Sequence, residues 1–358
     1  MPSPDAEKIR SVLAAIRALD PEPVQLMEVC GTHTMAIAKA GIRSLLPDGV
    51  SLISGPGCPV CVTPPERIDA VLELSEQPGI VITTYGDMLR VPGSVRGDSL
   101  RRRAALGADV RIVYSPVDAV RIAQSEPQKQ IVFLGVGFET TAPGTAAAVL
   151  TAAELGLKNF SLFSMLKAVE PSLRALTARP DVKVDGFLCP GHVATIVGER
   201  GFEFLPRDLG YPSVISGFEP EEILLSVYLL LKQIKEKNPR LQNAYRRAVA
   251  PQGNPAAMAM LKRCFTLQKS SWRGLGEIEA SGYVLCPELR EYDAEKRFGI
   301  RPRSAAPETG CRCGDVITGT LRPAQCPMFG TVCTPEDPLG PCMVSSEGAC
   351  AAAYKYME

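Results

Sequence analysis

The stretch VQLMEVCGTHTMAIAKAGIRSLL, residues 24–46, decides the fold class of this chain. Val24–Val29 is a short apolar run that predicts a buried strand, and Thr34–Leu46 has the pattern of a helix. Between them lies the turn CGTH, residues 30–33, which places a thiol and an imidazole directly after the strand. A strand, a glycine-containing turn and a helix in this order are the repeating unit of a parallel α/β sheet.

The same unit recurs along the chain as far as about Gly217. Helical patterns separate seven more short apolar runs, which predicts parallel sheets with helices on both faces. The polar segment Gln124–Gln130 divides the eight runs four and four, and we therefore expect two Rossmann-like lobes that face each other across a cleft. The further expected strands are Val50–Ile53, Gly79–Thr84, Val110–Tyr114, Ile131–Val136, Phe160–Phe163, Gly186–Leu188 and Ser213–Ile215.

The pattern changes after the last of these strands. Glu219–Lys237 is typical of a long amphipathic helix, with acidic residues at its start and lysines at its end, as the helix dipole favours. Beyond Phe265 the chain is rich in Gly, Pro and Cys. We therefore expect an α/β lobe over 1–128, a second α/β lobe over 129–240, and a smaller cysteine-rich iron–sulfur domain over 241–358.

Composition and charge restrict the class of protein. Hydrophobic residues make up 46% of the chain and charged residues 22%, which is typical of a soluble globular protein. Lys plus Arg and Asp plus Glu are 39 each, so no net positive charge favours nucleic acid. Residues 1–10 have no signal-peptide pattern, and the longest apolar run, Ile223–Leu231, is too short for a bilayer. We expect a cytoplasmic protein with neither nucleic-acid nor membrane partners, whose cysteines serve metal or redox chemistry.

The loops after the expected strands carry the chemically active side chains, as is usual in parallel sheets. The chain has only two histidines, His33 and His192, and each follows a cysteine, Cys30 or Cys189, by three residues. Thiolate and imidazole are ligands for iron, zinc or copper, so two such turns on facing lobes would meet at one metal site. The alternative is that the histidines cap helices or satisfy buried polar groups.

Cys58-Pro59-Val60-Cys61 follows the second expected strand. Two cysteines at this spacing can close a reversible disulfide, which favours a redox or metal function; half of a structural zinc site is the alternative. Cys30 stands alone in its loop and is expected to be a nucleophile or a metal ligand. Asp87 and Glu139 are expected either to accept a hydrogen bond from a ligating imidazole or to cap a helix.

Six of the twelve cysteines lie between residues 311 and 350, where there is no histidine. Six thiols are more than one four-thiolate site needs. We predict that four bind a metal cluster and that two form a dithiol. Since paired Cys-x-x-Cys knuckles are missing, iron–sulfur is slightly favoured over zinc. The predicted cluster ligands are Cys311, Cys326, Cys333 and Cys350, and the predicted dithiol is Cys313 with Cys342.

Five motifs together resemble the hydrogenase formation protein HypD family. In chain order they are MEVCGTHT (27–34), GPGCPVC (55–61), CPGH (189–192), GCRCG (310–314) and MVSSEGAC (343–350). The resemblance, from about Val24 to Tyr356, implies a maturation factor for NiFe hydrogenases, whose iron carries cyanide and carbon monoxide. It implies two α/β domains, a 4Fe–4S domain, and partners similar to the small chaperone HypC and to HypE, which delivers cyanide as a protein thiocyanate.

The resemblance also implies roles for individual residues. Cys30 would hold the iron together with a cysteine of the HypC-like partner, Cys58 and Cys61 would be the redox pair, and the four predicted cluster ligands would bind the 4Fe–4S group. Cleaving a thiocyanate takes two electrons, whereas such a cluster moves one at a time. We therefore expect a relay through Cys313 and Cys342 to Cys58 and Cys61. His33 and His192 are expected to ligate the iron, bind cyanide or supply protons, with Glu139 beside the site.

Two other functions stay open on the sequence. One is an iron–sulfur-dependent dithiol/disulfide oxidoreductase that acts on protein disulfides without bound iron or a partner. The other is a structural zinc protein that serves as an adaptor. For the leading function, the sequence leaves open whether the protein is an enzyme or a cofactor-assembly scaffold with redox activity.

Overall fold

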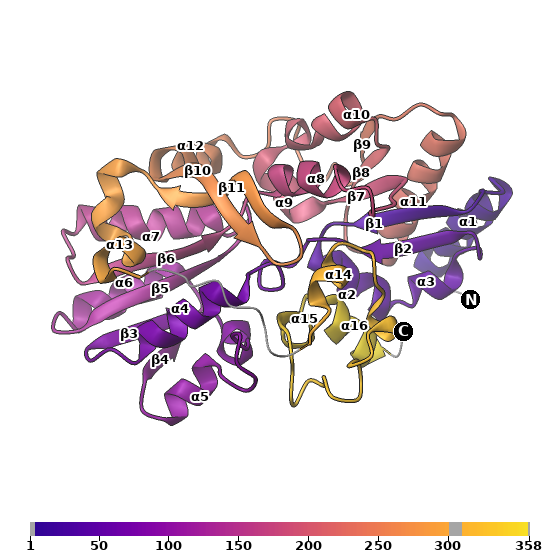
Figure 1. Cartoon of the computed structure of the whole chain (residues 1–358). Helices are drawn as coiled ribbons and strands as arrows, with labels where there is room; N and C mark the ends of the chain where they lie inside the picture. Colours follow the sequence, from indigo (N-terminus) through magenta and orange to yellow (C-terminus); the bar gives the residue numbers. More distant parts are fainter. Residues whose placement is uncertain (1–3, 301–309, 357–358) are drawn as a thin grey trace.

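The computed structural model describes residues 4–300 and 310–356, in which two parallel sheets are covered by helices (Figure 1). One sheet has five strands in the order β2-β1-β7-β8-β9, and the other has four in the order β4-β3-β5-β6. The predicted α/β class with two parallel sheets is therefore confirmed. The strands are β1 Val24–Glu28, β2 Val50–Ser54, β3 Ile80–Thr84, β4 Asp109–Ile112, β5 Gln130–Gly137, β6 Phe160–Leu166, β7 Gly186–Pro190, β8 Ser213–Ser216, β9 Leu241–Asn243, β10 Phe265–Trp272 and β11 Gly276–Leu285.

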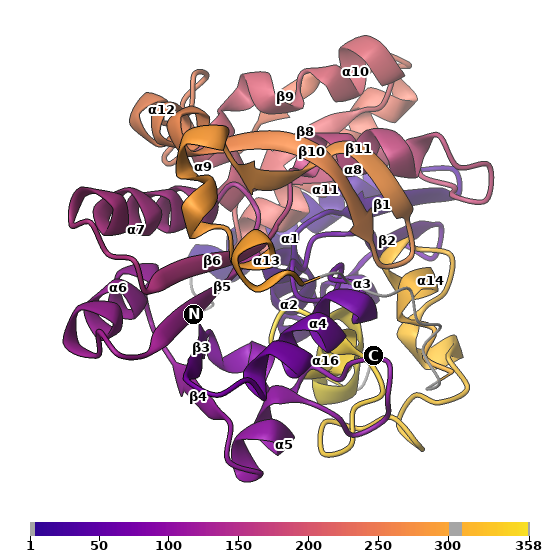
Figure 2. The same ribbon diagram turned by 60° about the vertical axis from the view of Figure 1, so that its left-hand side comes forward.

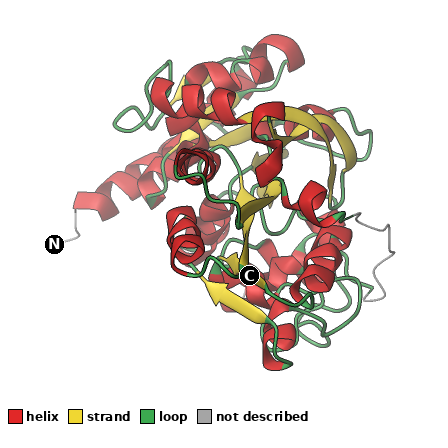
Figure 3. Cartoon of the chain, turned by 90° about the vertical axis from the view of Figure 1, so that its left-hand side faces the viewer, coloured by secondary structure: helices red, strands yellow, loops and turns green. Residues whose placement is uncertain are grey.

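Helices lie against both sheets (Figure 3). The expected helix Thr34–Leu46 is two helices, because Gly41 takes φ +60° and ends the first of them. No helix of the described ranges is long and apolar enough to cross a bilayer. The α-helices are α1 Pro4–Ala18, α2 Gly31–Lys39, α3 Ile42–Leu45, α4 Pro65–Ser75, α5 Leu100–Ala105, α6 Pro116–Ser125, α7 Ala142–Glu154, α8 Val169–Thr177, α9 Gly191–Val197, α10 Phe204–Leu209, α11 Pro220–Lys235, α12 Pro255–Cys264, α13 Ala294–Phe298, α14 Cys313–Ile317, α15 Pro341–Val344 and α16 Ala349–Tyr356; the 3₁₀ helices are η1 Gly86–Arg90, η2 Glu199–Phe202, η3 Pro287–Tyr292 and η4 Pro323–Gln325.

The chain builds the two sheets in an interleaved order. Strands β1 and β2 join β7, β8 and β9, whereas β3 to β6 form the other sheet. The expected division into 1–128 and 129–240 separates β3 from β5, yet these two strands are paired, with Val81 opposite Ile131. The four-and-four assignment of strands to lobes is therefore wrong.

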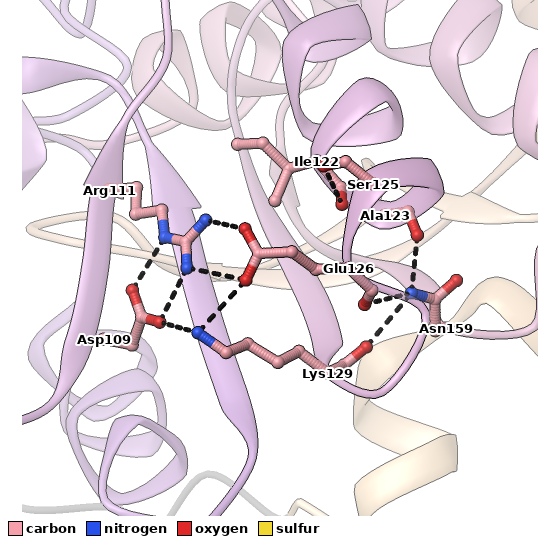
Figure 4. Close-up of polar contacts among 8 residues, drawn as sticks. All are labelled: Asp109, Arg111, Ile122, Ala123, Ser125, Glu126, Lys129 and Asn159. Carbon is pink, nitrogen blue, oxygen red and sulfur yellow. Dashed lines mark hydrogen bonds and ion pairs between the residues drawn. The ribbon is translucent and has the colours of Figure 1, made fainter.

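The polar segment Gln124–Gln130 explains this error, because it ties two strands of one sheet together (Figure 4). Lys129 donates to Asp109 Oδ2 at 2.9 Å, and Glu126 forms an ion pair with Arg111 of β4. The Asn159 side-chain amide donates to the carbonyl groups of Ala123, Glu126 and Lys129. The charges of this segment therefore belong to a network at the sheet edge and not to a linker.

The region after residue 240 does not form one separate domain. Strand β9 is the edge of the five-stranded sheet, and α12 packs against α7. The antiparallel hairpin β10–β11 then packs against β6 and α8 (Figure 2). The cysteine-rich part begins only at about residue 310, where α14 to α16 lie beside α2 and β2 (Figure 1). The expected boundary at residue 241 thus falls inside the α/β body.

Candidate functional site

The two Cys-x-x-His turns leave neighbouring strands of one sheet. Strands β1 and β7 are parallel partners, with Met27 opposite Phe187, and the Val29 amide donates to the Leu188 carbonyl at 3.2 Å. The turns that begin at Cys30 and Cys189 therefore emerge side by side. The sequence predicted that the turns would meet across two lobes; the structure brings them together because the chain returns to the first sheet.

Both histidines stack on Phe218. The ring centroid of Phe218 lies 4.7 Å from that of His33 and 3.9 Å from that of His192, with interplanar angles of 29° and 24°. His33 is fully buried, and its Nε2 lies 2.9 Å from the Gly217 carbonyl oxygen, whereas His192 is exposed. Burial lowers the pKa of His33 to about 4, so its imidazole is neutral at pH 7.

The neutral state and the hydrogen bond together fix the tautomer of His33. A carbonyl oxygen only accepts, so Nε2 carries the proton and donates it, which leaves a lone pair on Nδ1. This Nδ1 is buried and has no hydrogen-bond partner in the described part of the chain. The described residues also hold no group of three or more His, Cys, Asp or Glu side chains placed around one metal ion. The two imidazoles thus share one stacking partner, the Phe218 ring.

Cys30 lies at the start of α2, and its side chain is buried. The Gly57 carbonyl accepts from the Gly31 amide at 3.1 Å, and a side chain at position 57 would overlap the Cys30 backbone. The loop of the Cys-x-x-Cys motif is therefore packed directly on the Cys30 turn. Burial raises the pKa of Cys30 to about 11, and the nearby Glu347 carboxylate adds to this rise, so the thiol is protonated at pH 7.

Glu347, more than 300 residues later in the chain, contacts the Cys30 turn. Its Oε1 accepts from the Thr32 hydroxyl at 2.8 Å, and burial raises its pKa. A Cβ at Gly31 would lie 2.6 Å from the Glu347 carbonyl oxygen. Sequence reasoning gave Glu347 no role, because the only signal was its place inside the MVSSEGAC motif.

Cys58 and Cys61 form a disulfide, and both residues are buried. They line a small cavity, called here the thiol cavity. Residues of the Cys30 turn and of the cysteine-rich segment line it too. The Cys58–Cys61 disulfide and Cys342 therefore line the same space. The thiol cavity is lined by Gly31, Thr34, Ser54, Gly55, Cys58, Cys61, Val316, Ile317, Cys342, Glu347 and Ala349.

The predicted dithiol partners are in contact. The Sγ atoms of Cys313 and Cys342 lie 2.7 Å apart, and both residues are buried. Burial acts to raise the pKa of Cys313, but hydrogen bonds with Cys311 and Cys342 and the charge of Arg273 lower it overall. The same contact with Cys313 raises the pKa of Cys342. The contact between the two sulfurs thus moves the pKa values of Cys313 and Cys342 in opposite directions.

The four predicted cluster ligands line a second pocket, called here the cysteine pocket. Cys313 lines it too, whereas Cys342 does not. The walls are mostly apolar, and the Leu339 amide lies 3.4 Å from Cys333 Sγ. The cysteine pocket is lined by Cys311, Arg312, Cys313, Val316, Cys326, Met328, Phe329, Cys333, Leu339, Met343 and Cys350.

The tip of the β10–β11 hairpin joins the two thiol regions. The Arg273 amide donates to the Val62 carbonyl at 2.8 Å, and Arg273 Nε donates to the Thr63 carbonyl at 3.0 Å. Both acceptors directly follow Cys61 in the chain. A Cβ at Gly274 would lie 2.6 Å from the Gly314 carbonyl oxygen in α14. No motif in the sequence marked Arg273, because its partners lie more than 200 residues earlier in the chain.

In the described part of the chain, Glu139 and Asp87 make no hydrogen bond with either imidazole. Glu139 Oε1 accepts from the Val169 amide at 3.0 Å at the start of α8, and burial raises its pKa to about 7. Asp87 accepts from the amide and hydroxyl of Ser346, each at 3.0 Å. Of the two expected roles, the contacts of Glu139 match the helix cap, and those of Asp87 hold the turn before Glu347.

Comparison with known proteins agrees with the motifs. A family model described as "HypD: Hydrogenase formation hypA family" matches residues 7–357. Hydrogenase maturation factor HypD2 of Bradyrhizobium diazoefficiens is 43% identical, covering 98% of this chain and 95% of that protein. HypD of Rhodobacter capsulatus is 45% identical over 95% of this chain and 91% of its own, and HypD of Escherichia coli is 44% identical over 94% and 90%. This chain therefore belongs to the HypD family of hydrogenase formation proteins.

Proposed function

We propose that this chain acts in hydrogenase maturation, as the scaffold and redox centre on which the iron of a NiFe hydrogenase receives cyanide and carbon monoxide. One observation carries the proposal: the thiol cavity brings the Cys58–Cys61 disulfide, Cys342 and Glu347 together against the Cys30 turn. A site for iron and a source of electrons then lie side by side.

In this proposal the iron is cargo and Cys30 is its anchor. The Cys30 thiol is protonated when no cation is near, but a bound metal ion favours the thiolate and displaces the proton. One thiolate occupies only one coordination position on the iron. A cysteine of a HypC-like chaperone supplies a second thiolate ligand. His33 contributes its unpartnered Nδ1 lone pair, which can accept a hydrogen bond or bind the cation.

Cyanide transfer from a HypE-like thiocyanate requires two electrons. The S–C bond of the thiocyanate breaks, cyanide leaves for the iron, and the carrier sulfur ends as a thiol after taking up one proton. The dithiol form of Cys58 and Cys61 supplies the electron pair, becomes the disulfide, and releases two protons. One proton is therefore left over, and Glu347, whose pKa is raised by burial, lies at the thiol cavity to accept it.

Cys313 and Cys342 regenerate the dithiol. Thiol–disulfide exchange needs a thiolate within reach of the disulfide, and Cys342 lines the same cavity as Cys58 and Cys61. Four thiols with apolar walls and a sulfur-directed amide also suit a 4Fe–4S group in the cysteine pocket. Such a group, when bound to Cys311, Cys326, Cys333 and Cys350, supplies single electrons.

The alternative function, a general dithiol/disulfide oxidoreductase, fits less well. Exchange with a large protein disulfide requires an exposed attacking sulfur. Cys58 and Cys61 are 5% and 1% exposed, and the hairpin tip and the Cys30 turn cover their loop. A small carrier end or a bound partner suits this geometry better.

The test is anaerobic purification with the HypC-like chaperone, followed by infrared spectroscopy. The wild-type complex is expected to show bands of iron-bound cyanide and carbon monoxide, and Cys30→Ala is expected to remove them. Cys189→Ala is the matched control, since Cys189 starts the neighbouring Cys-x-x-His turn, is fully buried and should leave the bands intact. Bands that persist in Cys30→Ala would refute the anchor.

The relay is tested separately on the reduction of the disulfide. After dithionite is added, the Cys58–Cys61 disulfide is expected to be reduced at least tenfold more slowly in Cys313→Ser than in wild type. Mass spectrometry of alkylated thiols measures this rate. Cys264→Ser is the control, because Cys264 is fully buried and lines neither thiol site. An unchanged rate in Cys313→Ser would sink the relay while leaving the role of Cys30 untouched.

A further inference from the structure

Three stacked rings lie in the loops that follow three adjacent strands of the five-stranded sheet. His33 follows β1, His192 follows β7, and Phe218 follows β8, in the order in which these strands lie side by side. The Phe218 ring stacks with both imidazoles, at centroid distances of 4.7 and 3.9 Å. The only two histidines of the chain are thus linked through a single phenyl ring.

Phe218 is itself held from several directions. Its amide donates to Glu222 Oε2 at 3.0 Å, and the Arg247 side chain binds the other oxygen of this carboxylate at 2.9 Å. The Tyr245 ring meets the Phe218 ring edge-on at 5.8 Å, and the Arg247 guanidinium lies over Tyr245. These contacts set both the backbone and the ring plane of Phe218.

The neighbouring glycines show that this arrangement leaves no spare room. A Cβ at Gly191, the residue before His192, would lie 2.9 Å from the Tyr245 ring. A Cβ at Gly217 would overlap the Glu222 carboxylate and lie 2.8 Å from the same ring. Gly217 also provides the carbonyl oxygen that accepts the hydrogen bond from His33 Nε2. Two glycines therefore permit the close approach that the stack requires.

We propose that Phe218 is a positioning residue that holds His33 and His192 as one rigid unit beside Cys30. The His33 ring is fixed by a hydrogen bond at one edge and by Phe218 on its face, so its Nδ1 keeps one direction. Within the described ranges the His192 side chain makes no hydrogen bond, and stacking on Phe218 is what orients its exposed ring. The role in cofactor assembly rests on the proposed function; the positioning itself does not.

The first experiment measures the position of the imidazoles directly. With histidine labelled with carbon-13, the spectrum contains two Cε1–H signals, one for each ring. Both should carry the ring-current shift of Phe218 in the wild type and move toward the free-imidazole position in Phe218→Leu. Phe218→Tyr, which keeps the ring, should restore both shifts. Unchanged signals in Phe218→Leu would overturn the proposal.

Phe187→Leu is the matched control. Phe187 is a buried aromatic residue of β7 in the same sheet, but its ring contact is with Tyr211 and not with a histidine. It should lower stability without moving the two signals. Equal movement in both leucine variants would show a general loosening of the sheet and contradict a specific role of Phe218.

The second experiment measures the consequence for assembly. Infrared bands of iron-bound cyanide in the chaperone complex should form at least threefold more slowly in Phe218→Leu and at the normal rate in Phe218→Tyr. Normal assembly despite displaced histidine signals would overturn the positioning role in the reaction. If the wild-type complex shows no bands, the proposed function fails, and the spectroscopic experiment still decides whether Phe218 holds the histidines.

Discussion

Gly31 is the residue at which the two ends of the site touch. A side chain there would overlap Glu347 and approach its carbonyl oxygen to 2.6 Å. Gly31→Ala is therefore expected to lower the free energy of unfolding by about 1–3 kcal/mol, the usual cost of overpacking. Urea denaturation measures this. Gly86→Ala is the control, since a Cβ there meets nothing within 4 Å, and an equal loss in both would contradict the contact.

Glu139 makes stability depend on pH with a definite sign. Burial raises its pKa from 4.5 to about 7 in the folded chain, so the fold favours the protonated form. This stabilisation is fully present below about pH 4.5 and is lost as pH rises through 7. Relative to wild type, Glu139→Gln should therefore gain about 3 kcal/mol between pH 4.5 and pH 8. Urea denaturation of both proteins at several pH values measures this difference.

At this scale the sequence pointed to the cysteines as candidate residues but not to the residues that contact them. The reactivity of thiols made Cys30, Cys58, Cys61 and the late group visible as motifs. Phe218, Glu347 and Arg273 have ordinary side chains whose importance lies in what they touch. Their partners are distant in the chain, and no local pattern encodes such contacts.

The β10–β11 hairpin acts as a brace between the disulfide loop and α14. Gly274 and Gly276 both have positive φ, +80° and +75°, so alanine at either position costs about 1 kcal/mol in backbone strain. Only position 274 also meets Gly314. Gly274→Ala should thus destabilise the protein more and alter the fluorescence of Trp272, the single tryptophan, which is buried near the tip. Identical effects of the two variants would exclude the brace.

Elements with strong periodicity were predicted well, and their ends less so. The expected helix Glu219–Lys237 corresponds to α11, Pro220–Lys235, whose amphipathic pattern and terminal charges are unambiguous. The predicted strand Val110–Tyr114 is β4, Asp109–Ile112, because an edge strand lacks the second buried face that would mark its bounds. The hairpin was missed since its exposed faces are polar and read as loop.

Over the whole molecule, the sheets cannot be cut out of the chain at one point. A fragment of residues 1–128 contains β1 to β4 but lacks β7 and β5, the central partners of both sheets. We expect this fragment to be unfolded by circular dichroism and amide exchange, and to gain structure when mixed with 129–358. A folded fragment 1–128 on its own would contradict the interleaved topology. The sequence could not reveal this topology, since short buried strands carry no record of their partners.

The contact between Thr32 and Glu347 can form only late in the synthesis of the chain. The two residues are 315 positions apart. At the usual speed of protein synthesis, on the order of 15 to 60 seconds pass between their incorporation. During that interval a nascent chain already displays Cys30, while the carboxylate that covers its turn has not yet been made. The Cys30 turn therefore lacks this carboxylate for that interval, and the contact can form only after Glu347 has been added to the chain.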